Sequence, residues 1–415
     1  MPGSFYQRSG ESWRAPWADY ARWRNEPPAV IEGKDRNHDV VVLSRFDDVF
    51  AAVRNTADFS SAAGLTFEPG SMELFDDRGR PIVMMDPPDH TVMRRLVSGP
   101  MSPSRISDFE IRVREFVEER LDRIDLLVDE HRKEHRKGPE ENQGNNDSEP
   151  ISVELVELLL KPLPSFAVAY FLGIPRDALI DFDRWTQSIV EANANNTMMS
   201  AAAAISELYR FAEELIAFRR THPEQDLISD LAALDESVVT NSWIIGFIFT
   251  MVTGGNDTTT GLLGGSLDLL TEHRDQRNLL LAEPDLIRRS VEEFLRLTSP
   301  VQNLARQTTR SVAIGGVDLA PNQRVILLYG AANRDEREFG DDAELLRVTR
   351  PLVRHLSLGY GAHHCLGAAV ARSMGTITLD CLLSRFPDFW VDREQGTFAS
   401  GPYVRRYTTL PFYPN

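Results

Sequence analysis

The feature that most constrains this chain is one long, nearly all-apolar helical stretch, SVVTNSWIIGFIFTMVTGGNDTTTGLLGGSLDLLTEH, from Ser237 to His273. As a single helix it would be about 50 Å long, at about 1.5 Å per residue. Its middle is apolar on almost every face, which is typical of a helix enclosed by the core of a large domain. Helical periodicity dominates the rest of the chain too, and strand-like runs are few, so the sequence predicts a mainly α fold with small β-sheets.

The middle of this helix carries two adjacent glycines, Gly254 and Gly255, followed by Asn256, Asp257 and Thr258. Each glycine costs roughly 1 kcal/mol relative to alanine, so the pair predicts an interruption where a flat or small ligand can approach the backbone. The Thr258 hydroxyl is expected to bond the carbonyl of Gly254 and loosen the helix there. Asp257 beside Thr258 supplies the carboxylate and hydroxyl that stepwise proton delivery requires. The structural alternative is a plain helix break with Asp257 in a salt bridge.

One of only two cysteines lies in SLGYGAHHCLGAAVAR, where glycines precede an alanine-rich helical pattern. Cys365 is thus placed at a helix N-terminus, where free N–H groups are expected to lower its pKa and favour the thiolate. The other cysteine, Cys381, is too distant for a CxxC zinc site. A nucleophilic cysteine would need His363 or His364 as its base. The third possibility is that the thiolate binds a metal whose other ligands come from a macrocycle. Haem iron fits that description.

Two further pairs have helical spacing. Glu293 and Arg296 lie at i, i+3 within an apolar surrounding, which predicts a buried bidentate ion pair that orients its neighbours. His90 and Arg94 lie at i, i+4 after Pro87-Pro88, so both side chains can reach one anionic group. Each pair alone is also compatible with an ordinary ion pair or an exposed basic turn.

Charge and composition narrow the class of protein. The formal charge of −17 argues against a nucleic-acid-binding protein. The N-terminus has no signal-peptide core and no apolar run reaches the roughly 18 residues of a spanning helix, so the protein is expected to be cytoplasmic.

Residues 129–150 are charged and then Gly/Asn-rich, which predicts a mobile solvated loop or helix end. The strand-like segments on either side of Pro321-Asn322 predict a hairpin.

The motifs together resemble one known family. SLGYGAHHCLG resembles the haem-binding loop FxxGx[HR]xCxG of the cytochrome P450 monooxygenases, with Leu358 where the family normally has phenylalanine. HTVMR, GGNDTT and EFLR resemble the family's HxxxR, [AG]Gx[DE]TT and ExxR motifs, and they occur in the family's order. The resemblance covers nearly the whole chain. It implies the P450 fold in one domain spanning residues 1–415, with the long central helix over the haem and the cysteine loop, SLGYGAHHCLG, beneath it.

The resemblance also implies residue roles. Cys365 would be the iron ligand, Asp257 and Thr258 would deliver protons, and Glu293 with Arg296 would form a structural pair completed by an arginine such as Arg347. Haem b would be held by His90, Arg94, Gly254, Arg306, His363 and Cys365. By analogy of position, substrate would contact a lining that is mainly apolar: Leu65, Phe67, Met84, Thr250, Gly254, Gln302, Leu304, Tyr403 and Val404.

These roles predict a haem-thiolate monooxygenase that inserts one atom of O₂ into a hydrophobic small molecule. Electrons would come from NAD(P)H through an acidic ferredoxin-type donor and its reductase. Two segments without acidic residues, Leu345 to Leu379 and Thr91 to Ser107, suggest a basic docking face for that donor. Their arginines are Arg94, Arg95, Arg105, Arg347, Arg350, Arg354 and Arg372. The alternatives are a peroxide-driven peroxygenase or isomerase, and a haem-binding sensor without turnover.

Overall fold

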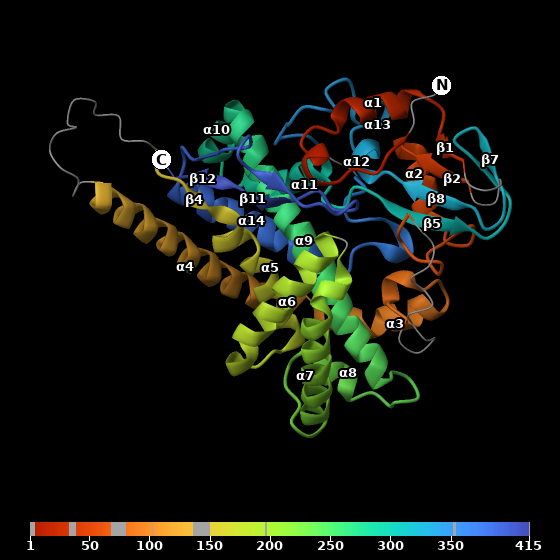
Figure 1. Ribbon diagram of the computed structural model, residues 1–415, viewed down its shortest axis with the longest axis horizontal. Coiled ribbons are helices and arrows are strands. Elements are labelled where there is room, and N and C mark those ends of the chain that lie inside the picture. The colour runs from red at the N-terminus through yellow and green to blue at the C-terminus, as the bar shows by residue number, and fades with distance from the viewer. Residues whose placement is uncertain are drawn as a thin grey trace.

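The computed structural model describes residues 5–32, 39–67, 80–101, 103–135, 150–195, 197–351 and 354–414. Helices dominate the fold and surround one central helix (Figure 1). The helices are α1 (Trp17–Asn25), α2 (Phe46–Arg54), α3 (Asp89–Ser98), α4 (Pro103–His135), α5 (Pro162–Leu172), α6 (Leu179–Ala194), α7 (Ala202–Thr221), α8 (Leu227–Ala232), α9 (Asn241–Glu272), α10 (Arg274–Ala282), α11 (Leu286–Thr298), α12 (Tyr329–Ala332), α13 (Glu336–Phe339) and α14 (Ala368–Arg385).

The central helix is α9, and it contacts α5, α6, α7, α8, α10, α11 and α14. Its N-cap, Thr240, accepts a hydrogen bond from the Trp243 N–H at 3.1 Å. The predicted buried helix is therefore confirmed, although it begins at Asn241 rather than Ser237. The predicted interruption is not present, because the helix runs without a break through Gly254 and Gly255.

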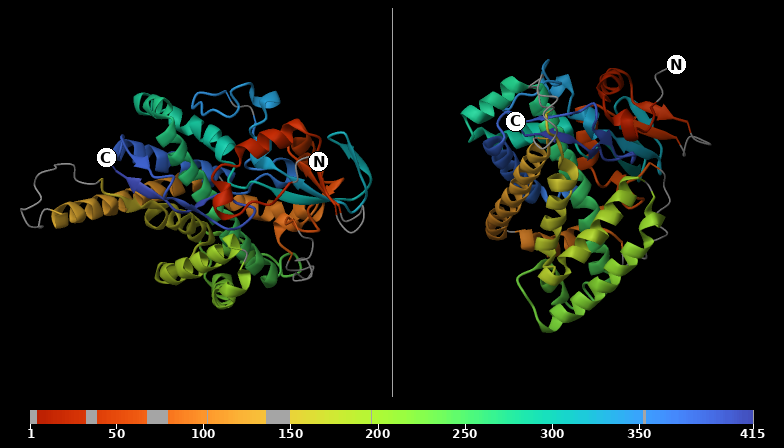
Figure 2. Two further views of the ribbon diagram at one scale, coloured as in Figure 1. Left: turned by 45° about the horizontal axis from the view of Figure 1, so that its top comes forward. Right: turned by 60° about the vertical axis from the view of Figure 1, so that its left-hand side comes forward.

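The strands form small sheets. A five-stranded sheet has the order β1 (Ala29–Ile31), β2 (Val40–Leu43), β8 (Arg324–Leu327), β5 (Leu304–Thr308) and β3 (Phe59–Ser60), with β2 and β8 parallel. A three-stranded sheet joins β4 (Val153–Glu154), β12 (Pro411–Tyr413) and β9 (Trp390–Val391), and β10 (Thr397–Phe398) pairs with β11 (Tyr407–Thr409). In Figures 1 and 2 the five-stranded sheet lies toward one end of the molecule, and α4 extends toward the other.

The predicted hairpin at Pro321-Asn322 is wrong in its position. The hairpin is formed by β6 (Val312–Ile314) and β7 (Val317–Leu319), with Gly315 and Gly316 as its two-residue turn. Both glycines have positive φ, 61° and 81°, as the tight hairpin turn requires. Asn322 also has positive φ, but its turn leads from β7 into a different sheet, because β8 pairs with β2 and β5.

The charged segment 129–150 begins as a helix end, which is one of the two predicted alternatives. Residues 129–135 continue α4 to its end at His135, and residues 136–149 lie outside the described part of the chain. Among the described residues no helix is long and apolar enough to cross a membrane.

Candidate active site

Hydrogen bonds within the protein itself hold the cysteine loop in place. The Cys365 N–H donates to the carbonyl of Leu358 at 2.7 Å, which closes the loop on itself. Asn333 holds the start of the loop, donating to Ser357 Oγ at 2.8 Å and accepting from the Leu356 N–H at 2.7 Å. At Gly359, where φ is +65°, an added Cβ would lie 3.1 Å from the carbonyl oxygen of His363. The loop therefore presents Cys365 in a fixed position just before α14 begins at Ala368.

Cys365 forms part of a large internal cavity of about 500 Å³. One side of the cavity is the cysteine loop with Leu358, Leu366 and Gly367, and α9 contributes Gly254 and Thr258. Beside Gly254 and Gly367 an added Cβ would meet no heavy atom within 4 Å. The missing side chains thus leave room for a flat group against both α9 and the cysteine loop, as the sequence predicts for Gly254.

The electrostatics of Cys365 differ from the expectation. Burial raises the pKa of the thiol, and the Gly367 N–H, Arg94 and Arg372 only partly oppose that effect. The helix N-terminus does not lower this pKa as predicted, because the low-polarity cavity disfavours the free thiolate more than the helix favours it. A bound metal cation would supply the missing stabilisation, because coordination deprotonates a thiol outright.

A cluster of basic side chains borders the same cavity. It consists of His90, Arg94, Arg306 and His363, and the two imidazole rings lie 4.3 Å apart. Burial, then Arg306, His90 and Arg94, lower the pKa of His363 to about 3. No carboxylate of the described residues pairs with Arg94 or Arg306. Converging donors of this kind fit a ligand that brings its own carboxylates.

Thr258 and its neighbour Asp257 face different surroundings. The Thr258 hydroxyl lies on the cavity wall and donates to the carbonyl of Gly254 at 3.0 Å, as predicted. The Asp257 carboxylate is buried and forms an ion pair with Arg406, at 2.5 Å from Oδ1 to Nε. Burial raises the pKa of Asp257, while Arg406, Asn193 and Lys161 oppose the rise. The salt bridge considered from the sequence is therefore present, with a partner from the C-terminal end of the chain.

Glu293 and Arg296 form the predicted buried pair. Arg296 Nε and Nη2 each donate to one carboxylate oxygen of Glu293 at 2.8 Å, and both residues are almost completely buried. Arg350 completes the network, since its Nε donates to Glu293 Oε1 at 3.0 Å. The prediction of Arg347 is wrong: only its backbone N–H reaches Glu293, while its guanidinium binds Asp342.

Comparison with known proteins identifies the family. The family model for cytochrome P450 matches residues 178–395. The chain is 43% identical to cytochrome P450 130 of Mycobacterium tuberculosis over 420 residues, which cover 99% of this chain and 98% of that protein.

The chain belongs to the cytochrome P450 family.

Other members share the fold over their full length. This P450 is 28% identical to linalool 8-monooxygenase of Pseudomonas putida, covering 93% of each chain. The crystal structure of CYP109E1 from Bacillus megaterium in complex with testosterone matches with a TM-score of 0.80 and 27% identity, covering 97% of this chain and 99% of that one. P450s are monooxygenases that use haem b, with molecular oxygen as co-substrate.

The residues of this P450 fit haem b. The open backbone at Gly254 and Gly367 suits a flat macrocycle, and the four-residue basic cluster suits its two propionates. The six residues predicted to bind haem, including Cys365, all line one cavity although they come from distant parts of the chain.

Most of the predicted substrate contacts lie on the cavity wall. These are Leu65, Thr250, Gly254, Leu304, Tyr403 and Val404. Phe67, Met84 and Gln302 are not among the described residues that line it. Gln302 is fully buried elsewhere, with its Nε2 donating to the carbonyls of Thr298 and Ser299 and its Oε1 accepting from the Tyr20 hydroxyl.

Several lining residues were missed from the sequence. Ile82 and Val83 take the place of Met84, and Thr66 that of Phe67. Thr253 could have been found, because it lies at i+3 from Thr250 and shares its helix face. Apolar residues of α5, such as Phe171, and Asn193 of α6 carry no motif that marks them.

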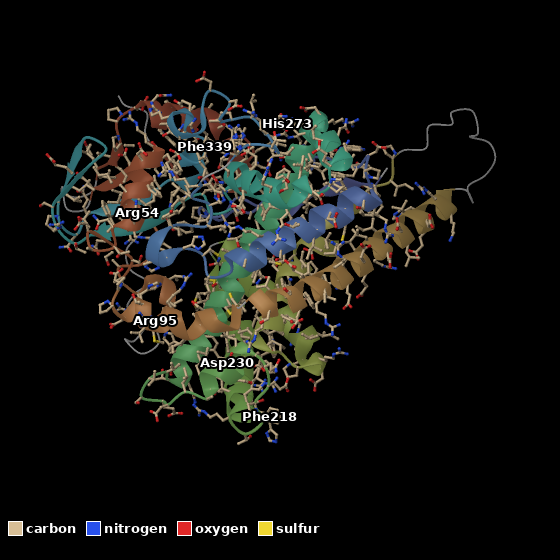
Figure 3. All side chains as sticks on the ribbon, turned by 180° about the vertical axis from the view of Figure 1, so that it is seen from behind. Arg54, Arg95, Phe218, Asp230, His273 and Phe339 are labelled. Carbon is tan, nitrogen blue, oxygen red and sulfur yellow. The ribbon has the colours of Figure 1, made fainter. Side chains whose placement is uncertain are left out.

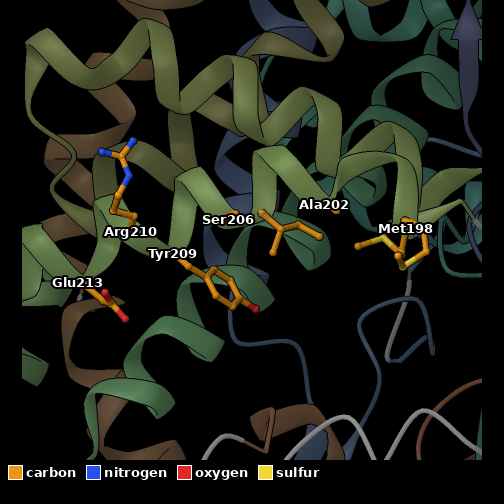
Figure 4. A pocket seen from close by; sticks show the side chains of 8 residues that line it. Met198, Ala202, Ser206, Tyr209, Arg210 and Glu213 are labelled. Atoms are coloured by element: carbon orange, nitrogen blue, oxygen red, sulfur yellow. The ribbon is translucent and has the colours of Figure 1, made fainter.

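A second hollow lies along one side of α7 and has a volume of about 600 Å³ (Figure 4). Its residues come from one continuous segment, from Met198 to Glu213, and they bring no cluster of catalytic groups together. The large cavity beside Cys365 is therefore the candidate active site.

The predicted surplus of positive charge beside the cysteine loop is smaller than the sequence suggests. Acidic residues from other segments pair with four of its exposed or half-buried arginines: Arg105 with Asp230, Arg347 with Asp342, Arg354 with Glu338, and Arg372 with Glu292. Arg350 is buried in the Glu293 network. Arg95 is exposed and has no acidic partner among the described residues.

Proposed function

We propose that this P450 inserts one atom of O₂ into a hydrophobic small molecule, with electrons supplied from NAD(P)H through an acidic ferredoxin-type protein. The observation that carries the proposal is the cavity itself. It joins Cys365 and Thr258 to a wall of apolar residues from many separate parts of the chain, including Leu65, Val168 and Phe247. Apolar walls with a few polar groups favour a hydrophobic ligand held in one orientation.

The chain's own residues have distinct roles in this proposal. His90, Arg94, Arg306 and His363 hold the propionates, and Cys365 provides the sulfur ligand to the iron. When bound, haem supplies the redox chemistry that divides O₂ between the substrate and water. Thr258 holds a hydroxyl proton at the cavity wall, and Asp257, one residue earlier on α9, is the proposed carboxylate of the proton path.

The substrate class is tested by optical titration of the ferric protein. Uncharged apolar compounds are expected to displace the water ligand and shift the spin state. Carboxylated analogues of the same compounds should bind at least about tenfold more weakly, because burying an unpaired carboxylate in this cavity is costly. Equal affinity for both sets would contradict the proposed hydrophobic substrate.

Thr258→Val distinguishes O₂-driven from peroxide-driven chemistry. The change removes only the hydroxyl, so product formed per NAD(P)H is expected to fall by about a hundredfold, the usual size of a lost proton-transfer group. Turnover with added hydrogen peroxide should be kept. The control is Thr260→Val, because the Thr260 hydroxyl bonds the carbonyl of Leu160 and is not on the cavity wall. Equal coupling in Thr258→Val and the unmodified protein would favour the peroxygenase alternative.

The proposed donor would dock around Arg54 and Arg95. Both are exposed, and Figure 3 labels them on the same side of the molecule. Arg54 borders the cysteine loop, since an added Cβ at Gly361 would lie 3.5 Å from its Cα. Beside it Tyr360, in the loop, packs edge-on against Phe50. Arg54 and Arg95, for which the described residues provide no acidic partner, offer an acidic donor a complementary surface.

Reversing both charges should weaken that docking. Arg54→Glu with Arg95→Glu is expected to slow reduction by a plant- or bacterial-type ferredoxin about tenfold at low salt, and to flatten its dependence on ionic strength. Stopped-flow reduction measures both effects. The control is Arg123→Glu on α4, which extends away from α2 in Figure 1. If Arg123→Glu slowed reduction as much as the Arg54→Glu, Arg95→Glu double variant, the proposed docking surface would be contradicted.

A further inference from the structure

One buried arginine, Arg324, donates hydrogen bonds to the backbone of residues 63–66, a segment that borders the cavity. Its Nη1 donates to the carbonyl of Ala63 at 3.1 Å, its Nη2 to that of Gly64 at 2.9 Å, and its Nε to that of Thr66 at 3.0 Å. Arg324 is 5% exposed and stands at the first position of β8. The side chain thus fixes three carbonyls within four residues of a segment that has no helix or strand of its own.

The same segment forms part of the cavity wall. Leu65 and Thr66 both line the cavity, and Arg324 binds the carbonyls of Gly64 and Thr66 on either side of Leu65. Two other contacts hold the segment from different elements: the Leu65 carbonyl accepts from the Ala305 N–H at 2.8 Å, and the Phe67 N–H donates to the Tyr403 hydroxyl at 3.2 Å. Any shift of the Arg324 side chain would therefore move atoms that face the ligand space.

Arg324, like Arg306, is a buried arginine near the site that has no acidic partner among the described residues. No carboxylate of the described residues lies within ion-pair distance of its guanidinium, whereas Arg296, Arg350 and Arg406 each pair with one. Burial lowers the pKa of Arg324 to about 10, so the group remains charged at neutral pH. A buried cation without a counter-charge is costly unless its hydrogen bonds are satisfied. The carbonyls of Ala63, Gly64 and Thr66 supply those acceptors.

We propose that Arg324 is a positioning residue that holds residues 63–66 against the cavity and so sets which substrate shapes the enzyme accepts. The inference rests on the proposed function, because it requires a substrate in that cavity. The planar guanidinium is essential, since its fixed fork reaches several carbonyls at once. A lysine at this position keeps the charge, but its N–H donors all lie on one nitrogen and cannot span the three carbonyls.

The test compares Arg324→Lys and Arg324→Gln with a control, Arg310→Lys. Arg310 also lies near this sheet, but its side chain is 73% exposed and pairs with Asp58. Each haem-loaded protein is titrated with a panel of uncharged apolar compounds that differ in shape, including cyclic and linear isomers. Spin-state shift gives the affinity, and product per NAD(P)H gives the coupling.

We expect Arg324→Lys to lose about tenfold in affinity for the best ligands, to discriminate less between isomers, and to couple less well. The lysine variant would leave a buried charge with few acceptors, and it could fail to fold for that reason. Arg324→Gln has no such charge, so it tests whether residues 63–66 need the guanidinium even if the lysine variant does not fold. Arg310→Lys should match the unmodified protein. Unchanged isomer preference and coupling in a folded Arg324 variant would overturn the inference while leaving the proposed function intact. No spin shift with any compound in the unmodified protein would overturn both.

Discussion

Replacing Cys365 by alanine is expected to abolish O₂-dependent turnover. No other thiol of the described residues can replace it, because Cys381 is buried within α14 and does not line the cavity. The ferrous–CO spectrum should lose its thiolate character, and the fraction of protein that retains haem should fall. Turnover is expected to drop to the background of the haem-free protein.

The control is Cys381→Ala. Burial raises the pKa of Cys381 to about 12, and its sulfur accepts a hydrogen bond from Arg114 at 3.3 Å. It therefore remains a protonated packing residue, and its loss should leave the thiolate spectrum unchanged. A Cys365→Ala protein that still showed thiolate character would contradict the assignment of the iron ligand.

Glu293→Gln is expected to have the largest effect on stability. The carboxylate accepts from Arg296, Arg350 and the Arg347 N–H, and Glu293 is only 1% exposed. The amide keeps the size of the side chain but leaves the buried Arg296 without its counter-charge. Breaking a buried pair in this way costs about 3–5 kcal/mol of unfolding free energy. Chemical denaturation of the haem-loaded protein, with urea as denaturant, measures the loss.

An ion pair with the same spacing provides the comparison. Arg112 and Glu115 also lie at i, i+3, in α4, but both side chains are more than half exposed. Glu115→Gln should cost less than about 1 kcal/mol, because solvent screens an exposed pair. Similar losses for Glu293→Gln and Glu115→Gln would mean that the Glu293 network does not carry the stability assigned to it.

Local spacing made much of the site predictable. Glu293 with Arg296, Thr258 with Gly254, and His90 with Arg94 are each set by the geometry of one helix, so their relation can be found from the sequence. The long apolar stretch likewise predicts a buried central helix. The family resemblance then adds residues from distant segments, such as Arg306, to the same cavity.

Partners supplied by distant parts of the chain could not be predicted. Arg406 pairs with Asp257 from the C-terminal end, and Arg350 rather than Arg347 reaches Glu293, because the path of the loop decides which side chain points inward. The pKa of Cys365 depends on how deeply the cavity encloses it, which the helix-start pattern alone cannot reveal. Four arginines of the acid-free segments likewise pair with acidic residues outside those segments, and the sequence alone does not show which ones.

The five-stranded sheet joins strands that are far apart in the sequence, and this affects the order in which the protein folds. Its strands β1, β2 and β3 lie within residues 29–60, yet they pair through β2 and β3 with β8 and β5, within residues 304–327. During synthesis the early strands cannot pair until the chain has been made as far as β5 and β8, whereas helices such as α5, α6 and α9 are closer in sequence. The cavity needs both parts, so it is expected to close last. Cofactor capture would then coincide with the final step of folding, and the haem supply at that moment should determine how much protein reaches the native state.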